Sequence, residues 1–120
     1  MEVKIGLHKT GALLHDVDQH NQNWSEEDVA PVRRFVAEYL PQLNNAPHRG
    51  AACIYTMTPD EHFVLDLHPE HSAVVIGSPC SGHGFKFAPV VGEILADLAE
   101  KGATALPAQF LSLSRFISRV

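Results

Sequence analysis

The stretch that decides the fold reads Ser81-Gly82-His83-Gly84-Phe85-Lys86, and it lies between a short apolar strand and an amphipathic helix. Its two glycines flank a histidine where the strand turns into the helix, and they let the backbone approach a flat ligand closely. Backbone N–H groups and the positive helix end converge there, which suits a partner with electron-rich oxygen or nitrogen atoms. A tight turn that only leads into a packed helix explains the same residues, so both interpretations stay open.

Two main helices are predicted. The helix after the turn carries Pro89 in its first turn and ends at Gly102, because proline suits a helix start and glycine a C-terminal cap. An earlier helix begins at a cap on Ser25 or Asp28, has acidic residues in its first turn and runs to about Leu40. Apolar residues recur along both segments at helical spacing.

Short strands are predicted around these helices. The segments Val3–His8 and Gly50–Thr56 read as strands, and Phe63–Leu67 pairs with Ala73–Ile76 as a hairpin. Residues Leu111–Leu113 read as a last edge strand. The expected fold class is therefore α+β, with two main helices packed on short antiparallel strands.

Composition excludes several classes of protein. The chain has 120 residues and a net charge of −5, and it contains no run of lysine and arginine, which argues against nucleic-acid binding. No apolar stretch approaches the ~20 residues that span a bilayer. No secretory signal follows Met1, and two cysteines are too few for a disulfide scaffold. We therefore expect a cytoplasmic protein with free thiols and no membrane partner.

Eight histidines raise the question of a metal site. His68 and His71 have the HxxH spacing, but Pro69 disfavours helix at His68, so a surface turn is expected there. Neither a Cys-x-x-Cys nor a His-Glu-x-x-His motif accompanies them. We expect no metal site, and a histidine-rich metal binder is the alternative that elemental analysis would decide.

Two further segments carry reactive side chains. Strand alternation puts Cys53 and Tyr55 on one face, and the cation Arg49 nearby in sequence would favour the thiolate. A cysteine buried as a small hydrophobe is the alternative. Lys4 and His8 share a face of the first predicted strand, with a glycine between them that leaves room for something flat. A solvated strand face is the alternative there.

Three motifs occur in a fixed order: Lys4-Ile-Gly-Leu-His8, Cys53-Ile-Tyr-Thr56 and Ser81-Gly-His-Gly-Phe-Lys86. This order resembles the C-terminal third of the monomeric sarcosine oxidase family, which includes N-methyltryptophan oxidase and pipecolate oxidase. The resemblance runs from about residue 3 to residue 116. Members of this family are FAD-dependent amine oxidases that convert a secondary amine to an imine and reduce oxygen to hydrogen peroxide.

The resemblance implies a fragment of a two-domain FAD-dependent oxidoreductase fold. Residues 1–48 would belong to the substrate (catalytic) domain and residues 49–120 to the FAD-binding domain. The substrate would be a small amine or amino acid. The chain lacks the G-x-G-x-x-G fingerprint for the pyrophosphate of a dinucleotide, so a part of the cofactor site would lie elsewhere.

The resemblance also implies a role for each matching residue. Cys53 is similar to the cysteine whose sulfur attaches to the 8α-methyl carbon of the flavin. Lys4 is similar to the lysine beside flavin N5 that activates oxygen, an electrostatic role. His8 is similar to an active-site histidine near the substrate, Tyr55 to a residue of the substrate-site wall, and Lys86 to the lysine that pairs with the substrate carboxylate.

The glycine-rich turn would face the cofactor. The resemblance places the backbone of Gly82, His83 and Gly84, followed by Lys86, against the pyrimidine edge of the flavin. A helix N-terminus there stabilises an anionic reduced flavin by about 0.3–2 kcal/mol. The chain departs from the family pattern just before the turn, where it reads Gly77-Ser-Pro-Cys80 instead of Gly-x-Gly-Phe.

The isolated chain is expected to fold without FAD, to be catalytically inactive and to form homo-oligomers. The reason is that open edges of the predicted strands Val3–Leu7 and Gly50–Thr56 would recruit identical copies. A non-catalytic, self-associating interaction module derived from the same fold is the alternative function.

Overall fold

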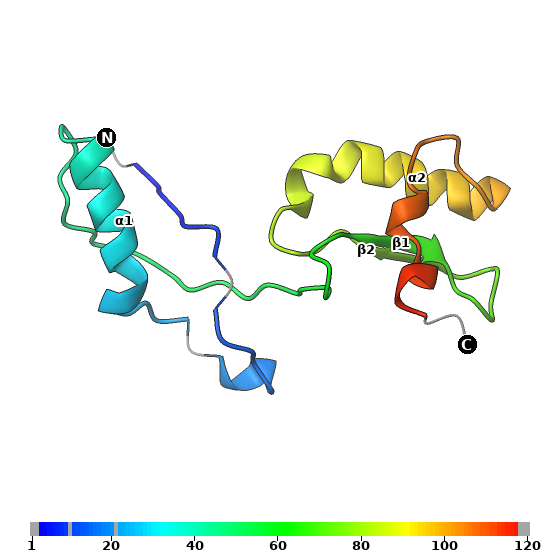
Figure 1. The fold of residues 1–120 in the computed structure, drawn as a ribbon, viewed down its shortest axis with the longest axis horizontal. Helices are drawn as coiled ribbons and strands as arrows, with labels where there is room; N and C mark the ends of the chain where they lie inside the picture. Colours follow the sequence, from blue (N-terminus) through cyan, green and yellow to red (C-terminus); the bar gives the residue numbers. More distant parts are fainter. Residues whose placement is uncertain (1–2, 10, 21, 118–120) are drawn as a thin grey trace. The chain divides into compact units, whose positions relative to one another are not determined.

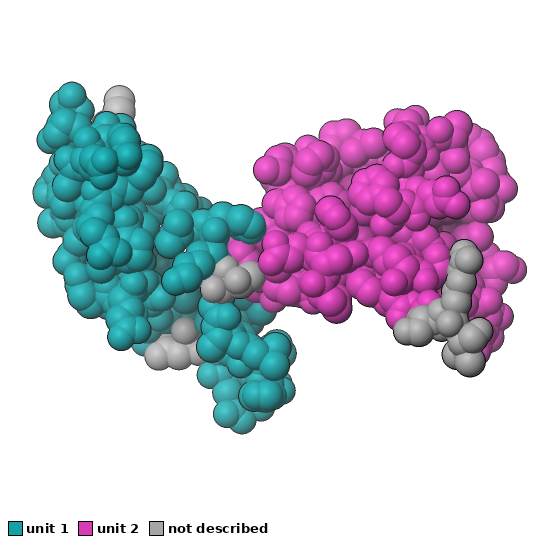
Figure 2. All heavy atoms as spheres, viewed as in Figure 1, with its two compact units in different colours: residues 1–54 teal, residues 55–120 magenta. Residues whose placement is uncertain are grey.

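The chain divides into two compact units, residues 1–54 and residues 55–120 (Figures 1 and 2). The structure, a computed structural model, describes residues 3–9, 11–20 and 22–117. Within these ranges it contains two α-helices and one two-stranded antiparallel sheet, which confirms the expected α+β class. No helix among the described residues has the length and apolar character needed to cross a membrane.

The first unit is built around α1 (Glu26–Tyr39), which follows a short 3₁₀ helix, η1 (Val17–Gln19). Ser25 caps α1 through a reciprocal pair of hydrogen bonds. The Asp28 N–H donates to Ser25 Oγ over 3.3 Å, and the Ser25 N–H donates to Asp28 Oδ2 over 2.8 Å. This capping box satisfies two backbone donors at the helix start. The predicted first helix is therefore confirmed, cap included.

The two strands predicted for the first half of the chain are wrong. Val3–His8 and Gly50–Thr56 have no strand assignment. A strand needs a partner that accepts its N–H groups, and alternation of apolar residues does not supply one. The second segment is instead tied by single bonds: the Ala52 N–H donates to the Gln22 carbonyl over 3.0 Å, and the Ala52 carbonyl lies 3.1 Å from His20 Nε2.

The second unit is a hairpin covered by a helix. Strands β1 (Val64–Leu67) and β2 (Val75–Ser78) pair antiparallel, so the predicted hairpin is confirmed with its second strand shifted toward the C-terminus. Helix α2 (Ala88–Lys101) packs against both strands and ends at Gly102 with a φ of 71°, as expected for a glycine cap. The core joins six buried apolar residues, namely Phe63, Leu65, Val91, Ile94, Ala108 and Leu111.

The last predicted strand is also wrong. Residues 109–116 form two 3₁₀ helices, η3 (Gln109–Leu111) and η4 (Leu113–Phe116), which contact β1 (Figure 1). The carboxylate of Asp66 holds this tail, because its Oδ2 accepts from Ser112 Oγ over 2.7 Å and from the Leu113 N–H over 2.8 Å. A side-chain acceptor thus takes the place of a strand partner, which permits a 3₁₀ conformation.

Candidate functional site

The Ser81–Gly84 turn, which joins β2 to α2, has an unusual backbone. Ser81 and Gly82 both lie in the left-handed region, with φ values of 58° and 74°. This region costs an L-residue with a side chain about 1–2 kcal/mol, whereas glycine enters it freely. Ser81 is only 1% exposed, and its N–H donates to the Thr56 carbonyl over 2.7 Å. Tertiary contacts therefore hold a strained residue at the start of the turn.

Gly84 is required by packing within the turn itself. A Cβ on Gly84 would lie 1.9 Å from the carbonyl oxygen of Pro79 and 2.7 Å from its carbonyl carbon. Both are backbone atoms, so neither can move aside as a flexible side chain would. Gly84 therefore allows a close approach of the chain's own backbone at Pro79, whereas the close approach predicted from the sequence was that of a flat ligand. Gly82, in contrast, is exposed.

The side chain of His83 turns back onto the turn. Its Nδ1 lies 2.8 Å from the Ser81 carbonyl oxygen. Because a carbonyl oxygen only accepts, Nδ1 carries the hydrogen, which leaves Nε2 as the acceptor in the neutral ring. The imidazole also packs on the Phe63 ring, with 4.8 Å between the centroids. The ring thus has a fixed tautomer and a fixed orientation.

The helix start lies later than the sequence predicts. A 3₁₀ helix, η2 (Gly84–Phe87), separates the turn from α2, whose first residue is Ala88. The N-terminus of α2 therefore does not coincide with the glycines. Lys86 lies within η2 and is exposed, with its Nζ 5.8 Å from the centroid of the Phe87 ring. The neighbouring Phe85 is 96% exposed.

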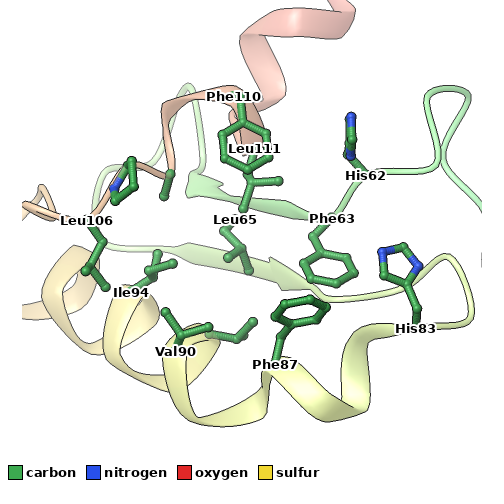
Figure 3. A pocket seen from close by; sticks show the side chains of 13 residues that line it. His62, Phe63, Leu65, His83, Phe87, Val90, Ile94, Leu106, Phe110 and Leu111 are labelled. Atoms are coloured by element: carbon green, nitrogen blue, oxygen red, sulfur yellow. The ribbon is translucent and has the colours of Figure 1, made fainter.

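A cavity of about 360 Å³ lies beside the turn, between α2 on one side and β1 with the tail on the other (Figure 3). Figure 3 shows Phe63, Phe87 and His83 at one end, with Ile94 and Leu106 toward the other. Two imidazoles, those of His62 and His83, are its polar side chains, and no lysine, arginine or carboxylate among residues 3–9, 11–20 and 22–117 lines it. The lining residues are His62, Phe63, Leu65, His83, Phe87, Val90, Val91, Ile94, Leu106, Pro107, Ala108, Phe110 and Leu111.

A loop at residues 58–62 connects the turn to the C-terminal tail. The residues Thr58-Pro59-Asp60-Glu61 predict a turn, but they do not predict these connections. Thr58 Oγ1 lies 3.3 Å from Ser81 Oγ on one side of the loop. On the other side Asp60 forms a two-pronged ion pair with Arg115, at 2.6 Å to Nε and 3.3 Å to Nη2. The guanidinium holds the pKa of the Asp60 carboxyl well below its usual range. Pro59-Asp60-Glu61 signals a turn, but no local pattern signals a partner at position 115.

The predicted site residues fall in both units. Lys4, His8 and Cys53 are exposed residues of the first unit. In the second unit Tyr55 is half-buried and Lys86 is exposed, and the turn brings Gly82, His83 and Gly84 together beside Lys86. The Cys53 thiol is exposed, so within this chain it is not buried as a small hydrophobe. Among residues 3–9, 11–20 and 22–117, no three His, Cys, Asp or Glu side chains gather as a metal site would need.

The chain is similar in sequence to several amine oxidases. Monomeric sarcosine oxidase of Bacillus sp. (strain NS-129) is 48% identical over 115 residues, which cover 94% of this chain and 30% of that protein. N-methyl-L-tryptophan oxidase of Salmonella arizonae is 39% identical over 116 residues, which cover 96% of this chain and 31% of that protein. The chain thus spans about 30% of the length of these relatives.

A solved structure shares the fold. The structure of NikD, described as an unusual amino acid oxidase essential for nikkomycin biosynthesis, matches with a TM-score of 0.65 and 25% identity. The match covers 82% of this chain and 26% of that chain. The family model for FAD dependent oxidoreductases of the DAO type matches residues 3–98, which include all three sequence motifs. The chain belongs to the DAO family of FAD dependent oxidoreductases.

Proposed function

We propose that these residues supply part of an FAD-dependent oxidase of secondary amines or N-methyl amino acids, as in sarcosine oxidase. The observation that carries this proposal is the ordered set of motifs within a region 48% identical to a monomeric sarcosine oxidase. When bound, FAD accepts a hydride equivalent from the carbon next to the amine and passes both electrons to oxygen, which gives an imine and hydrogen peroxide.

Each unit would contribute residues whose chemistry suits the flavin ring. The turn offers an exposed Gly82, over which a flat ring can approach the backbone, and the first unit offers the exposed Cys53 thiol as the proposed attachment point. A pyrophosphate would need a glycine-rich strand-to-helix fingerprint, which the sequence lacks. The proposed contribution is therefore to the flavin ring, and the rest of the cofactor would be held by other residues.

Two lysines receive separate roles in this proposal. The exposed ammonium of Lys86 would pair with the substrate carboxylate, because a mobile point charge next to an open surface can follow an incoming anion. The exposed Lys4 would place its charge near flavin N5, where it favours electron transfer to oxygen. His8 and Tyr55 would line the substrate site. The backbone of Gly82, His83 and Gly84 would lie against the flavin.

The division into domains is part of the same proposal. We assign residues 1–48 to the substrate domain and residues 49–120 to the FAD-binding domain of the oxidase. The two compact units support a division in this region, since the second unit begins at Tyr55 and contains the whole turn. We also propose a cytoplasmic location, because Cys53 and Cys80 are free thiols.

The chain by itself is proposed to be colourless and self-associating, and a non-catalytic interaction module is the second candidate function. Large apolar side chains favour association: Phe85 is 96% exposed, Leu13 is 80% exposed and Phe110 is 59% exposed. The strands that were expected to pair between copies are not formed. The proposed self-association therefore rests on these exposed apolar side chains instead. Light scattering with a flavin spectrum is the test. A colourless dimer or larger species is expected, and a monomer with stoichiometric FAD contradicts the proposal.

A chimera tests the oxidase function. The chain replaces the matching 115-residue region of the Bacillus sp. (strain NS-129) monomeric sarcosine oxidase. The expected product is a yellow protein that forms hydrogen peroxide when sarcosine is added. The matched control is the same chimera with His83→Ala, which keeps the glycines but removes the imidazole. A chimera that folds, as judged by circular dichroism, yet binds no flavin contradicts the proposed function.

A further inference from the structure

We propose that Arg115, in the C-terminal tail, is a positioning residue for the Ser81–Gly84 turn. The inference rests on the proposed function in one respect, namely that this turn faces the flavin. The structure supplies the connection: a continuous set of hydrogen bonds runs from the guanidinium through the loop at residues 58–62 to the buried hydroxyl of Ser81.

The Arg115 guanidinium fixes the loop from outside. Besides its two contacts with Asp60, it donates from Nη2 to the Phe63 carbonyl over 2.7 Å and from Nη1 to the Ser112 carbonyl over 2.9 Å. Its side chain is 17% exposed and that of Asp60 is 33% exposed. The His62 carbonyl also accepts from Nη2, over 3.5 Å. Five acceptor atoms around the planar guanidinium define a single orientation, which a flexible lysine ammonium would not reproduce.

Hydrogen bonds within the loop connect Asp60 to the buried Ser81. Asp60 Oδ1 accepts from the His62 N–H over 3.2 Å, and the His62 carbonyl accepts from Thr58 Oγ1 over 2.6 Å. Because the Thr58 hydroxyl has one hydrogen, the 3.3 Å contact with Ser81 is a bond that Ser81 Oγ donates to Thr58 Oγ1. Each polar group in the sequence of bonds thus has a defined role as donor or acceptor.

Backbone strain occurs at two places along this connection. Among the described residues, two that are not glycine have a positive φ: Glu61 at 60° and Ser81 at 58°. Glu61 lies in the loop between Asp60 and His62, and its N–H donates to the Thr58 carbonyl over 3.1 Å, whereas Ser81 opens the turn. Strain of this kind persists where surrounding contacts over-determine the backbone, and it clusters at functional sites. Loss of the hydrogen bonds of the loop should therefore let Ser81 leave its left-handed conformation and change the orientation of the turn.

Amide hydrogen exchange on the full 120-residue chain tests the inference without any flavin. Arg115→Gln is expected to raise the exchange rate of the Ser81 N–H at least tenfold more than it raises the rates of the β1 and β2 amides. Thr58→Val is expected to do the same. The double variant should add less than twofold to either single variant, because both act through one set of bonds. Arg115→Lys should restore only part of the protection.

One control variant and one milder test variant keep the test decisive. Arg33→Gln removes a comparable ion pair in the first unit, where Arg33 Nη1 lies 2.7 Å from Glu26 Oε1, and it should leave Ser81 unchanged. Asp60→Asn is the milder variant if Arg115→Gln does not fold, and a selective rise at Ser81 is again expected. The inference is overturned if Ser81 exchange stays constant, rises only as much as the hairpin amides, or rises additively in the double variant.

The same variant in the chimera separates this inference from the proposed function. If Arg115→Gln loosens Ser81 and also shifts the flavin absorbance bands, both are supported. If it loosens Ser81 and leaves the flavin spectrum unchanged, Arg115 is a positioning residue and the turn does not face the flavin.

Discussion

Gly84→Ala is the substitution for which the structure predicts the largest effect of a single methyl group. Its Cβ would lie 1.9 Å from the Pro79 carbonyl oxygen, whereas ordinary van der Waals contact begins at 3.4 Å. Overpacking costs about 1–3 kcal/mol when neighbouring side chains can shift. Here the backbone of Pro79 must move, so we expect the free energy of unfolding to fall by about 3 kcal/mol. For a unit the size of residues 55–120, which contains Gly84, that loss corresponds to a Tm lower by roughly 12–24 °C.

Urea unfolding followed by circular dichroism measures this change. The matched control is Gly92→Ala, because Gly92 lies inside α2 and a Cβ there meets nothing within 4 Å. Alanine at an open helical position is expected to stabilise the chain by about 0.5–1 kcal/mol. The two substitutions add the same methyl group and should have opposite signs. A Gly84→Ala chain as stable as the wild type would refute the packing argument for the turn.

Two further predictions concern charges. The folded-state pKa of Asp60 lies below its ordinary value of 3.8 because Arg115 binds its charged form, so this stabilisation is present above about pH 4 and is lost as the pH falls further. The stability of Arg115→Gln, measured by urea unfolding, should therefore fall less steeply below pH 4, and an equal slope contradicts the prediction. In the chimera, stopped-flow kinetics of Lys4→Met should show slower reoxidation with little change in reduction, whereas Lys86→Ala should weaken carboxylate binding by about 1.5–3 kcal/mol. Equal losses in both half-reactions for both variants would contradict the separate roles.

Local signals explain the parts of the fold that the sequence predicts well. The Ser25 cap, the Gly102 end of α2 and the hairpin of β1 and β2 all depend on residues close to one another in the chain. The two glycines of the turn have separate structural reasons: Gly82 has a positive φ, and Gly84 lies against the Pro79 carbonyl.

Distant contacts explain what the sequence did not predict. The segment Leu111–Leu113 has the pattern of a strand, but the Asp66 carboxylate, far away in sequence, accepts hydrogen bonds from the Ser112 hydroxyl and from the Leu113 N–H. The same holds for the loop at residues 58–62, since its partner Arg115 lies beyond α2. Neither contact leaves a periodic or spaced pattern, so sequence reasoning has no signal for it.

The proposed flavin attachment to Cys53 gives the most direct test of the proposed function. The chimera is denatured in acid, digested and analysed by mass spectrometry, together with its Cys53→Ala and Cys80→Ala variants. Cys80 is the matched control, because it is a free thiol that is half-buried and lies 3.9 Å from Ser81 Oγ. We predict that flavin mass stays on the peptide containing Cys53, is lost in Cys53→Ala and is retained in Cys80→Ala. Flavin that is fully released from the wild-type chimera, or found on the Cys80 peptide, would contradict the account.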